Sequence, residues 1–348
     1  MNKIMKKDIR DISQEDLEKF FSENNLQKFR LKQLQEWLWK KGANSFEEMS
    51  SLSKDLRSLL DKTFEIKCAN IDQEFVSKDG TIKYSFKLHD DKLIEGVIIP
   101  SKKRVTACIS SQIGCSLACT FCATGTLKLS RNLTHGEIFD QVFKLNQESE
   151  KNYGRSLTNI VFMGMGEPLL NYNALLKAIH NITSTSGMAI SPRRITVSTA
   201  GLAKQIMQLA DDEVKFNLAV SLHSAVDEIR SDIMPINDSI NLATLRESIR
   251  YFYEKTNNRV TYEYILFKGL NDDLDAARKL AAFCRISPCK VNLIEYNTVD
   301  DLDFEKSTDE NTEGFIDFLE HRNIIVHLRR SKGKDIAAAC GQLVNKLQ

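Results

Sequence analysis

The sequence lacks any long apolar run. No uninterrupted hydrophobic stretch in its 348 residues approaches the roughly 18 residues that a bilayer-spanning helix needs. The N-terminal stretch MNKIMKKDIRDISQEDLEKF contains no apolar core of signal-peptide length. These absences predict a cytoplasmic protein. In that reducing compartment, the eight cysteines are expected to bind metal or take part in catalysis rather than form structural disulfides.

The sequence also lacks a surplus of either charge. Charged residues make up 27% of the chain, yet the formal net charge is only +1. This balance excludes a strongly basic protein that binds polyanions over its whole surface. Any nucleic-acid site must therefore be a local patch.

Residues 1–66 are polar, show helical periodicity, and predict a helical, basic accessory domain. Two interpretations of its basic stretch remain open: a solvated helix with a packed apolar face, or a module that contacts phosphates. The apolar residues at helical spacing are Phe29, Leu31, Leu34, Trp37 and Leu38. The charged residues around them are Lys28, Arg30, Lys32, Lys40 and Lys41, with the single acid Glu36.

The remaining residues, 67–348, predict a second, catalytic domain. Residues 67–100 alternate in a strand-like way around Asp79-Gly80, a hairpin signal, and predict a short antiparallel β extension. Residues 101–332 alternate strands with helices, which indicates a parallel sheet with helical crossovers and favours a partial (β/α)6-type barrel over a doubly wound sheet. Residues 333–348 form a C-terminal segment. The predicted strands are VTACISS, TNIVFMGM, RRITVSTA, FNLAVSLH, VTYEYILF and KVNLIEYN, with NIIVHLRR as a further candidate.

Three cysteines lie close together after the first of these strands. Cys115, Cys119 and Cys122 form a C-x3-C-x2-C loop. A structural zinc site needs four ligands, and the nearest histidine is His135, beyond the loop. A redox pair is also conceivable, although the spacing is not that of thioredoxin. A cubane iron–sulfur cluster held by three thiolates leaves one iron open to bind a small molecule.

Polar residues recur where the apolar strands end. The turn MGMGEP, with Gly166 and Glu167, ends the second strand, and Ser198 lies near the end of the third. The fourth strand ends in Ser221, Leu222 and His223, and Asn297 ends the sixth. Taken singly, each is most often a helix cap, a tight turn or a buried structural residue. Their shared position matters more, because barrel enzymes carry out chemistry at the carboxyl ends of their strands.

The cysteine spacing after the first barrel strand, with the aromatic Phe121 between the last two cysteines, resembles the radical S-adenosylmethionine (SAM) superfamily. The resemblance implies that Cys115, Cys119 and Cys122 hold a 4Fe–4S cluster whose open iron chelates SAM. Reductive cleavage of SAM would then yield a 5′-deoxyadenosyl radical. The same resemblance implies that Gly166 and Glu167 bind the SAM amino group.

The resemblance narrows to one family within that superfamily. The segments ISSQIGCSLACTFCATG, FMGMGEPLLN, RRITVSTAG, SLHSAVDEIR, MPIN and AAACGQL are similar, in order and spacing, to the bacterial RNA adenine-C2 methyltransferases. This likeness covers nearly the whole chain. It implies SAM contacts at Ser198, at Ser221, Leu222 and His223, and at Asn297.

The family's chemistry implies roles for three further residues. One SAM methylates a cysteine, matched by Cys340, and a second SAM supplies the radical that removes hydrogen from that methyl group. The carbon radical adds to adenine C2, a base matched by Glu95 takes the C2 proton, and a resolving cysteine matched by Cys108 forms a disulfide that releases the product. From the residues alone, both cysteines could equally be small buried apolar groups, and Glu95 a surface charge. Cys68, Cys284 and Cys289 match no functional position.

The resemblance implies RNA partners: 23S rRNA and tRNA next to the anticodon. It also implies an external one-electron reductant of flavodoxin type, and we expect a monomer. Local charge for RNA is expected in three places: residues 28–41, Lys128 with Arg131, and the cations of HRNIIVHLRRSKGKD. Two alternatives remain open: a Cfr-like methylase of adenine C8, and a non-catalytic RNA-binding module stabilised by a metal or cluster.

Overall fold

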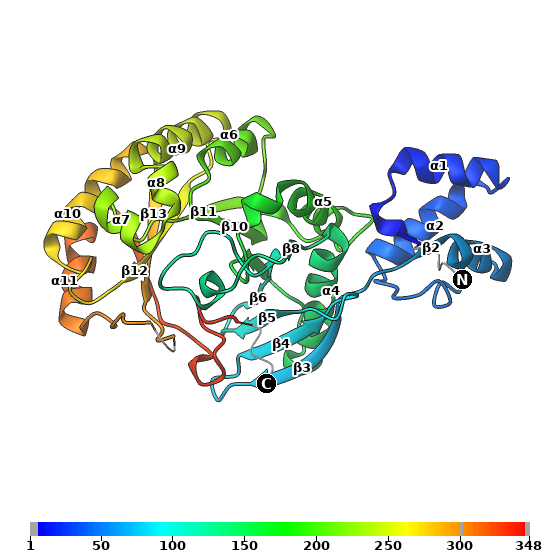
Figure 1. Cartoon of the computed structure of the whole chain (residues 1–348), viewed down its shortest axis with the longest axis horizontal. Coiled ribbons are helices and arrows are strands. Elements are labelled where there is room, and N and C mark those ends of the chain that lie inside the picture. Colours follow the sequence, from blue (N-terminus) through cyan, green and yellow to red (C-terminus); the bar gives the residue numbers. More distant parts are fainter. Residues whose placement is uncertain (1–5, 300–301, 345–348) are drawn as a thin grey trace.

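A computed structural model describes residues 6–299 and 302–344. Residues 1–5 of the predicted N-terminal domain, 300–301 of the predicted barrel and 345–348 of the predicted C-terminal segment lie outside the described residues. The main sheet has the strand order β14-β13-β12-β11-β10-β9-β6-β5-β4-β3 (Figure 1). All neighbours from β6 to β14 run parallel, whereas β3 to β6 pair antiparallel. None of the described helices is long and apolar enough to cross a membrane.

The parallel strands and their crossover helices form the partial barrel. Its strands are β6 (Val105–Cys108), β9 (Asn159–Phe162), β10 (Ile195–Thr199), β11 (Asn217–Ser221), β12 (Val260–Leu266), β13 (Cys289–Glu295) and β14 (Ile325–Arg329). Its helices are α4 (His135–Tyr153), α5 (Tyr172–Thr183), α6 (Ala203–Asp211), α7 (Asp227–Ile233), α8 (Ile236–Ser239), α9 (Leu242–Thr256), α10 (Leu274–Phe283) and α11 (Asp309–Glu320). The six predicted strands and the further candidate are all present, which confirms the predicted barrel class.

Local sequence explains where these elements begin and end. Helix α4 begins with a capping box, in which Thr134 and Glu137 satisfy each other's backbone N–H groups, and ends at Gly154 in the left-handed conformation. The strands of the barrel are largely apolar because their side chains belong to the buried core, which the crossover helices cover on the outside. The result is a curved sheet with α6, α9, α10 and α11 along its outside (Figure 1).

The β extension continues the barrel sheet without a break. It consists of β3 (Asn70–Val76), β4 (Ile82–Lys87) and β5 (Leu93–Pro100), and β3 and β4 flank the predicted Asp79-Gly80 turn. Strand β5 pairs with β6, so the first barrel strand is covered on both sides. A short ribbon of β7 (Gln112–Ile113) and β8 (Arg131–Asn132) brackets the cysteine loop.

The N-terminal segment forms a helical module with its own apolar cluster. It contains β1 (Lys7–Asp8), α1 (Gln14–Glu23), α2 (Lys28–Trp39), α3 (Lys54–Thr63) and β2 (Phe64–Glu65). On α2, Leu31, Leu34 and Leu38 are buried, as the periodicity predicts, but Phe29 is 47% exposed. At about 100° per residue, Phe29 lies about 200° around the helix from Leu31, on the solvent side.

A buried ion pair connects this module to the barrel. Arg10 contacts Asp140 of α4 at 2.9 Å and Asp8 at 3.1 Å, and all three side chains are buried. Asp140 also accepts the N–H of Ala69, which follows the module directly. Gly136 of α4 lies against the guanidinium, where a Cβ would be 2.6 Å from Arg10 Cζ. A larger residue at this point would require the Arg10 side chain to shift from its place between Asp8 and Asp140.

Candidate active site

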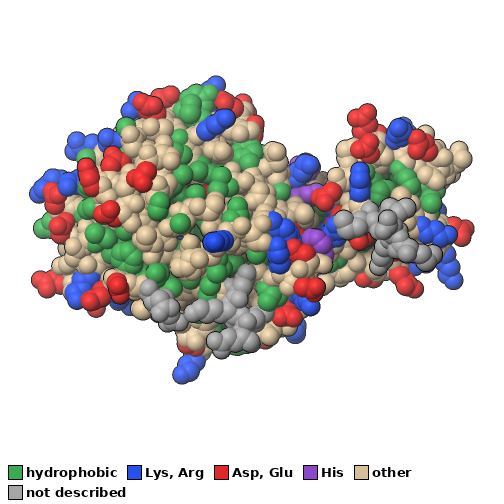
Figure 2. All heavy atoms as spheres, in the orientation of Figure 1, with side chains coloured by type: hydrophobic (Ala, Val, Ile, Leu, Met, Phe, Trp, Pro, Cys, Tyr) green, Lys and Arg blue, Asp and Glu red, His purple; other side chains and the backbone are tan. Residues whose placement is uncertain are grey.

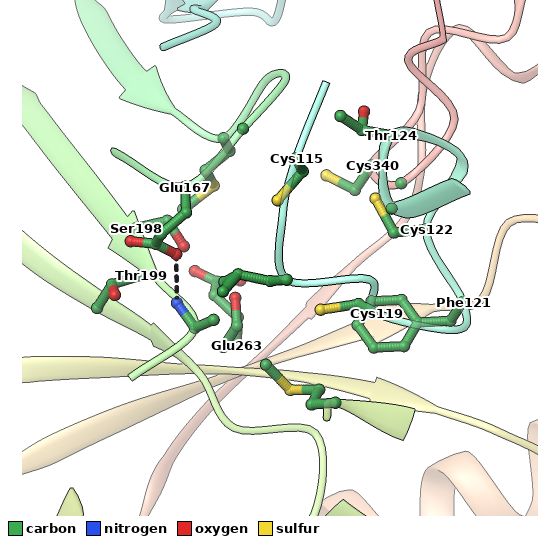
Figure 3. Close-up of a pocket in the computed structure, with 18 of the residues that line it drawn as sticks. Cys115, Cys119, Phe121, Cys122, Thr124, Glu167, Ser198, Thr199, Glu263 and Cys340 are labelled. Atoms are coloured by element: carbon green, nitrogen blue, oxygen red, sulfur yellow. Dashed lines mark hydrogen bonds between the residues drawn. The ribbon is translucent and has the colours of Figure 1, made fainter. Parts of the chain in front are cut away.

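The three cysteines of the loop line one pocket at the carboxyl ends of the parallel strands. The pocket encloses about 880 Å³, including space open to solvent. The thiols of Cys115, Cys119, Cys122 and Cys340 face a common space, opposite Glu167 and Ser198 (Figure 3). The predicted clustering of polar residues at this end of the barrel is therefore observed.

The loop is held in shape by its own backbone. The N–H of Cys122 donates to the carbonyl of Cys119 at 3.2 Å, and that of Cys115 to Leu127 at 3.4 Å. A Cβ at Gly125 would lie 2.5 Å from the carbonyl oxygen of Cys119, so the tight return of the chain requires glycine. Burial raises the pKa of all three thiols, to about 11 at Cys115. A bound metal would keep them as thiolates at neutral pH.

The spacing of these thiols bears on which metal they can hold. Among residues 6–299 and 302–344, no three Cys, His, Asp or Glu side chains converge as ligands of a single metal ion. A cubane cluster makes a different demand, because each thiolate binds a different iron. Three thiols spread around one pocket therefore fit a cluster with one open iron, and the donor set matches it.

The turn after β9 provides a buried carboxylate. Gly166 has φ +91°, and a Cβ there would lie 2.4 Å from the Gln112 side chain. Glu167 accepts the N–H of Ala200 at 2.8 Å and that of Leu169 at 3.0 Å. Burial nevertheless raises its pKa to about 7. A cation bound beside it would restore the charged form, so this carboxylate fits an ammonium group.

The predicted SAM residues occupy two kinds of position. Ser198, Ser221 and His223 line the pocket, whereas Leu222 is fully buried beneath it. His223 has φ +56° and accepts the N–H of Ile265 through Nδ1 at 3.1 Å. Burial, aided by the charge of Arg230, lowers its pKa to about 3, so the imidazole is neutral.

Asn297 lies beside the pocket and contacts the segment that carries Cys340. Its Nδ2 donates to the Cys340 carbonyl at 3.2 Å. Its Oδ1 is buried and has no hydrogen-bond partner within the described part of the chain. A buried amide oxygen of this kind is suited to accept a hydrogen bond from a bound ligand.

The C-terminal segment brings Cys340 to the cluster loop. The N–H of Ala123 donates to the Gly341 carbonyl at 2.7 Å, and the Thr124 hydroxyl donates to the Leu343 carbonyl at 2.6 Å. Cys108, at the end of β6, is buried and lies outside the pocket lining. Burial raises the pKa of Cys108 to about 12, and the nearby Cys340 thiolate contributes to that rise.

Glu95 is a buried group and not the surface charge that the sequence left open. It is 6% exposed, on β5. Its carboxylate contacts Lys83 Nζ at 3.0 Å and accepts the N–H of Val344 at 2.9 Å. Glu95 does not line the pocket, but it lies against the segment that carries Cys340. Lys83, its counter-ion, was not predicted.

Sequence reasoning also missed an ion pair inside the barrel. Glu263 of β12 lines the pocket, contacts Arg329 at 3.2 Å, and accepts the Asn292 amide at 2.8 Å. The positive charge of Arg329 lowers the pKa of both Cys108 and Cys340, against the larger effect of burial. The available signal was the acid in the middle of the otherwise apolar strand VTYEYIL.

Arg230 is a second missed residue, and its role is to hold the ends of two strands. It is 1% exposed and donates to the carbonyls of Ala200 at 2.6 Å and Leu222 at 3.2 Å. Arg230→Met should lower the free energy of unfolding by about 3 kcal/mol, because buried carbonyls lose a charged donor. Urea unfolding measures this. The matched control is Arg278→Met, because the Arg278 side chain is 66% exposed. Equal losses of unfolding free energy in both variants would refute the structural role of Arg230.

Two family models match the chain. The model of the radical SAM superfamily covers residues 109–281, from the end of β6 through most of α10. By this match, by the pocket just described and by the full-length relatives, the protein is a radical SAM enzyme. Residues 7–66 match the ribosomal RNA large subunit methyltransferase N-terminal domain.

Full-length relatives identify the family. A probable dual-specificity RNA methyltransferase RlmN from Flavobacterium psychrophilum is 53% identical, with 99% of each chain covered. The dual-specificity RNA methyltransferase RlmN 2 of Myxococcus xanthus is 43% identical over 97% of this chain and 91% of its own. A crystal structure of a radical SAM methyltransferase from Sphaerobacter thermophilus superimposes with a TM-score of 0.91 at 37% identity, covering 97% of this chain and 99% of the other. The chain belongs to the RlmN family of radical SAM methyltransferases, which use a 4Fe–4S cluster and SAM.

Proposed function

We propose that this enzyme methylates C2 of adenosine in 23S rRNA and in tRNA next to the anticodon, through a methylated cysteine. The observation that carries the proposal is the position of Cys340, in the same pocket as the three cysteines of the cluster loop. The names of the relatives, which describe dual-specificity RNA methyltransferases, support the two substrate classes.

Some of the pocket residues would hold the iron–sulfur cluster, and the others would bind SAM. Cys115, Cys119 and Cys122 would hold the cluster, which when bound supplies an electron for the cleavage of SAM. Gly166 and Glu167 would bind the SAM amino group, since Glu167 is a buried carboxylate without a cationic partner in the described residues. Ser198, Ser221 and neutral His223 would provide polar contacts, with buried Leu222 between the last two in the chain. Asn297 would offer its Oδ1, which has no hydrogen-bond partner among the residues that the structure describes.

Three residues of the protein would carry out methyl transfer, proton removal and product release. Cys340 carries the methyl group and delivers its carbon to adenine C2, which is electron-poor and cannot attack SAM as a nucleophile. Glu95, held beside the C-terminal segment by Lys83, takes the C2 proton. Cys108 then attacks the sulfur of Cys340 and forms a disulfide with it. The bond from that sulfur to the transferred carbon breaks, and the carbon takes up the proton that the Cys108 thiol gives up, which completes the methyl group. The pKa of Cys108, which the charge of Cys340 raises beyond the effect of burial, supports the proximity of the two thiols.

The target adenine must leave its stack to reach this pocket. RNA contact must be local, because acidic and basic side chains are interspersed over the face shown in Figure 2. The C-terminal cations are largely engaged within the chain: Arg329 with Glu263, Lys334 with Glu295, and Lys332 with the Pro100 carbonyl. Helix α2 with the two residues that follow it is the better candidate. Its cations Lys28, Lys32, Lys40 and Lys41 are exposed and form no ion pair within residues 6–299 and 302–344.

Charge reversal on α2 tests whether this helix contacts RNA. Arg30 donates to the Ser51 carbonyl at 3.1 Å and should be left intact. Lys28→Glu with Lys32→Glu should weaken RNA binding and reduce its salt dependence, because fewer phosphate counterions are released. SAM cleavage should persist. Binding measured at several salt concentrations tests this, with Lys19→Glu on α1 as the matched control. Unchanged affinity in the double variant would show that α2 is only a solvated face.

The function itself is tested on two RNAs in parallel. The cluster-loaded enzyme is incubated anaerobically with SAM, a one-electron reductant, and 23S rRNA or tRNA transcripts. Digestion and chromatography then separate 2-methyladenosine from 8-methyladenosine. We expect 2-methyladenosine in both RNAs; 8-methyladenosine, or unmodified RNA despite SAM cleavage, would refute the proposal. We further propose a flavodoxin-like reductant, a monomeric state and a cytoplasmic location.

A further inference from the structure

Cys284 and Cys289 form a pair of adjacent thiols that the proposed reaction does not use. The Sγ of Cys289 lies 3.7 Å from the carbonyl oxygen of Cys284. Cys284 opens the short 3-10 turn η5 (Cys284–Ile286) after α10, and Cys289 is the first residue of β13. The catalytic pocket lies at the opposite, carboxyl end of the strands. The pair is therefore separate from Cys108 and Cys340.

The surrounding residues fix the backbone that carries this pair. The ring of Phe283 packs edge-on against Tyr262 at 5.4 Å between centroids. Arg246 of α9 lies 5.3 Å over the Phe283 ring and donates to the Ala282 carbonyl at 3.3 Å. On the other side, Cys289 pairs in register with Val260 of β12. The contact between Cys289 and Cys284 is therefore made on a backbone that is held from both sides.

The two thiols differ in exposure and in acidity. Cys289 is half-buried, whereas Cys284 is buried. The pKa of Cys289 is lowered by a hydrogen bond from the Cys284 thiol and by the charge of Arg259, against the effect of burial. The pKa of Cys284 is raised, by the same hydrogen bond and by burial. This asymmetry is typical of a dithiol in which one sulfur attacks and the other resolves.

Two buried hydroxyls complete the surroundings of the pair. The hydroxyls of Tyr262 and Ser287 are buried and have no hydrogen-bond partner in the part of the chain that the structure describes. Tyr262 lies near enough to both thiols for their charges to raise its pKa further, beyond the effect of burial. Hydroxyl groups at this position can donate to an anionic sulfur, which an entirely apolar site could not accommodate.

We propose that Cys284 and Cys289 are a thiol–disulfide exchange site for small-molecule disulfides. The Cys289 thiolate attacks one sulfur of the small disulfide and expels the other half as a thiolate, which leaves a mixed disulfide on Cys289. The Cys284 sulfur then attacks Cys289 Sγ and expels the second half. The protons of the two cysteines pass to the released thiolates. One small disulfide is thereby reduced to two thiols, and the pair is oxidised to one disulfide.

Peptide mapping of the holoenzyme tests this site directly. The cluster-loaded enzyme is incubated anaerobically with glutathione disulfide, denatured in N-ethylmaleimide and digested with trypsin. Cleavage after Arg285 separates the two cysteines into the peptides 280–285 and 286–290. We expect these peptides to be joined by a disulfide, with near-complete loss of maleimide labelling at both cysteines. Full labelling of both would overturn the proposal.

Single variants test the order of attack. Cys284→Ser should retain glutathione on Cys289, because the resolving sulfur is missing. Cys289→Ser should leave Cys284 free of glutathione, because the buried thiol is inaccessible. The reverse pattern would contradict the assigned order. Cys68→Ser, outside the pair, should leave the linked peptides unchanged.

The wild-type measurement needs no variant, so a variant that misfolds does not weaken the test. Its readout also does not involve methylation. Failure of this site and failure of the proposed function are therefore separate results.

Discussion

Replacing any one of Cys115, Cys119 and Cys122 by Ala is expected to abolish iron binding and SAM cleavage together. Each thiolate binds a different iron, so the two cysteines that remain cannot hold the four-iron cluster. Without the cluster there is no open iron to bind SAM. We expect iron and sulfide to fall to background in anaerobically purified protein, and no 5′-deoxyadenosine to form from SAM.

The matched control is Cys68→Ala. Cys68 is a half-buried thiol near the Asn44 carbonyl, 3.7 Å away and outside the pocket. This variant should keep its iron and its cleavage activity. SAM cleavage that persists in any of the three loop variants would contradict the cluster assignment. Loss of iron in the Cys68 variant would show instead that iron content reports only general damage to the fold.

The parts of the site that could be predicted are those encoded in short segments. The cysteine loop, the Gly166-Glu167 turn and the serines at strand ends follow from local pattern, because a parallel barrel brings all carboxyl ends of its strands to one edge. The strands themselves were recognisable as apolar runs between helical segments. The family resemblance then supplied roles that pattern alone left open.

The parts that could not be predicted depend on contacts between distant segments. The Ala123 N–H donates to the Gly341 carbonyl, and backbone hydrogen bonds of this kind leave no signature in residue type. The burial of Glu95 follows from the pairing of β4, β5 and β6 and from the return of the C-terminal segment. In the sequence, Glu95 is a single acid in a strand that could have lain at the edge of the sheet. This pattern does not distinguish an exposed carboxylate from a buried one. For the same reason Lys83 was missed, and Arg329 was expected to contact RNA although it pairs with Glu263 inside the barrel.

Cys108→Ala is expected to leave RNA covalently attached to the protein, whereas Cys340→Ala is expected to attach none. Without Cys340 there is no methyl carrier, and the bond to adenine cannot form. Without Cys108 the bond forms, but no thiol attacks the Cys340 sulfur to release the RNA. The two losses of methylated product are therefore equal in extent and different in kind.

Glu95→Gln should resemble Cys108→Ala. The amide cannot accept the C2 proton, so the adduct forms and is not resolved. Glu95 is buried against Lys83, and an amide of the same shape retains the contact with the Val344 N–H. Glu74→Gln on the exposed part of β3 is the matched control and should turn over normally.

A denaturing gel with labelled RNA measures these outcomes. The expected link is a thioether, so the shifted band should resist thiol reductants, and mass spectrometry of the digested adduct should locate the nucleotide on Cys340. A band that reductants remove would indicate a disulfide and not this adduct. Normal turnover by Cys108→Ala, or cross-linking by Cys340→Ala, would show that the roles are wrongly assigned. The two cysteines would then be a buried structural pair, and the methyl group would have to reach adenine by another route.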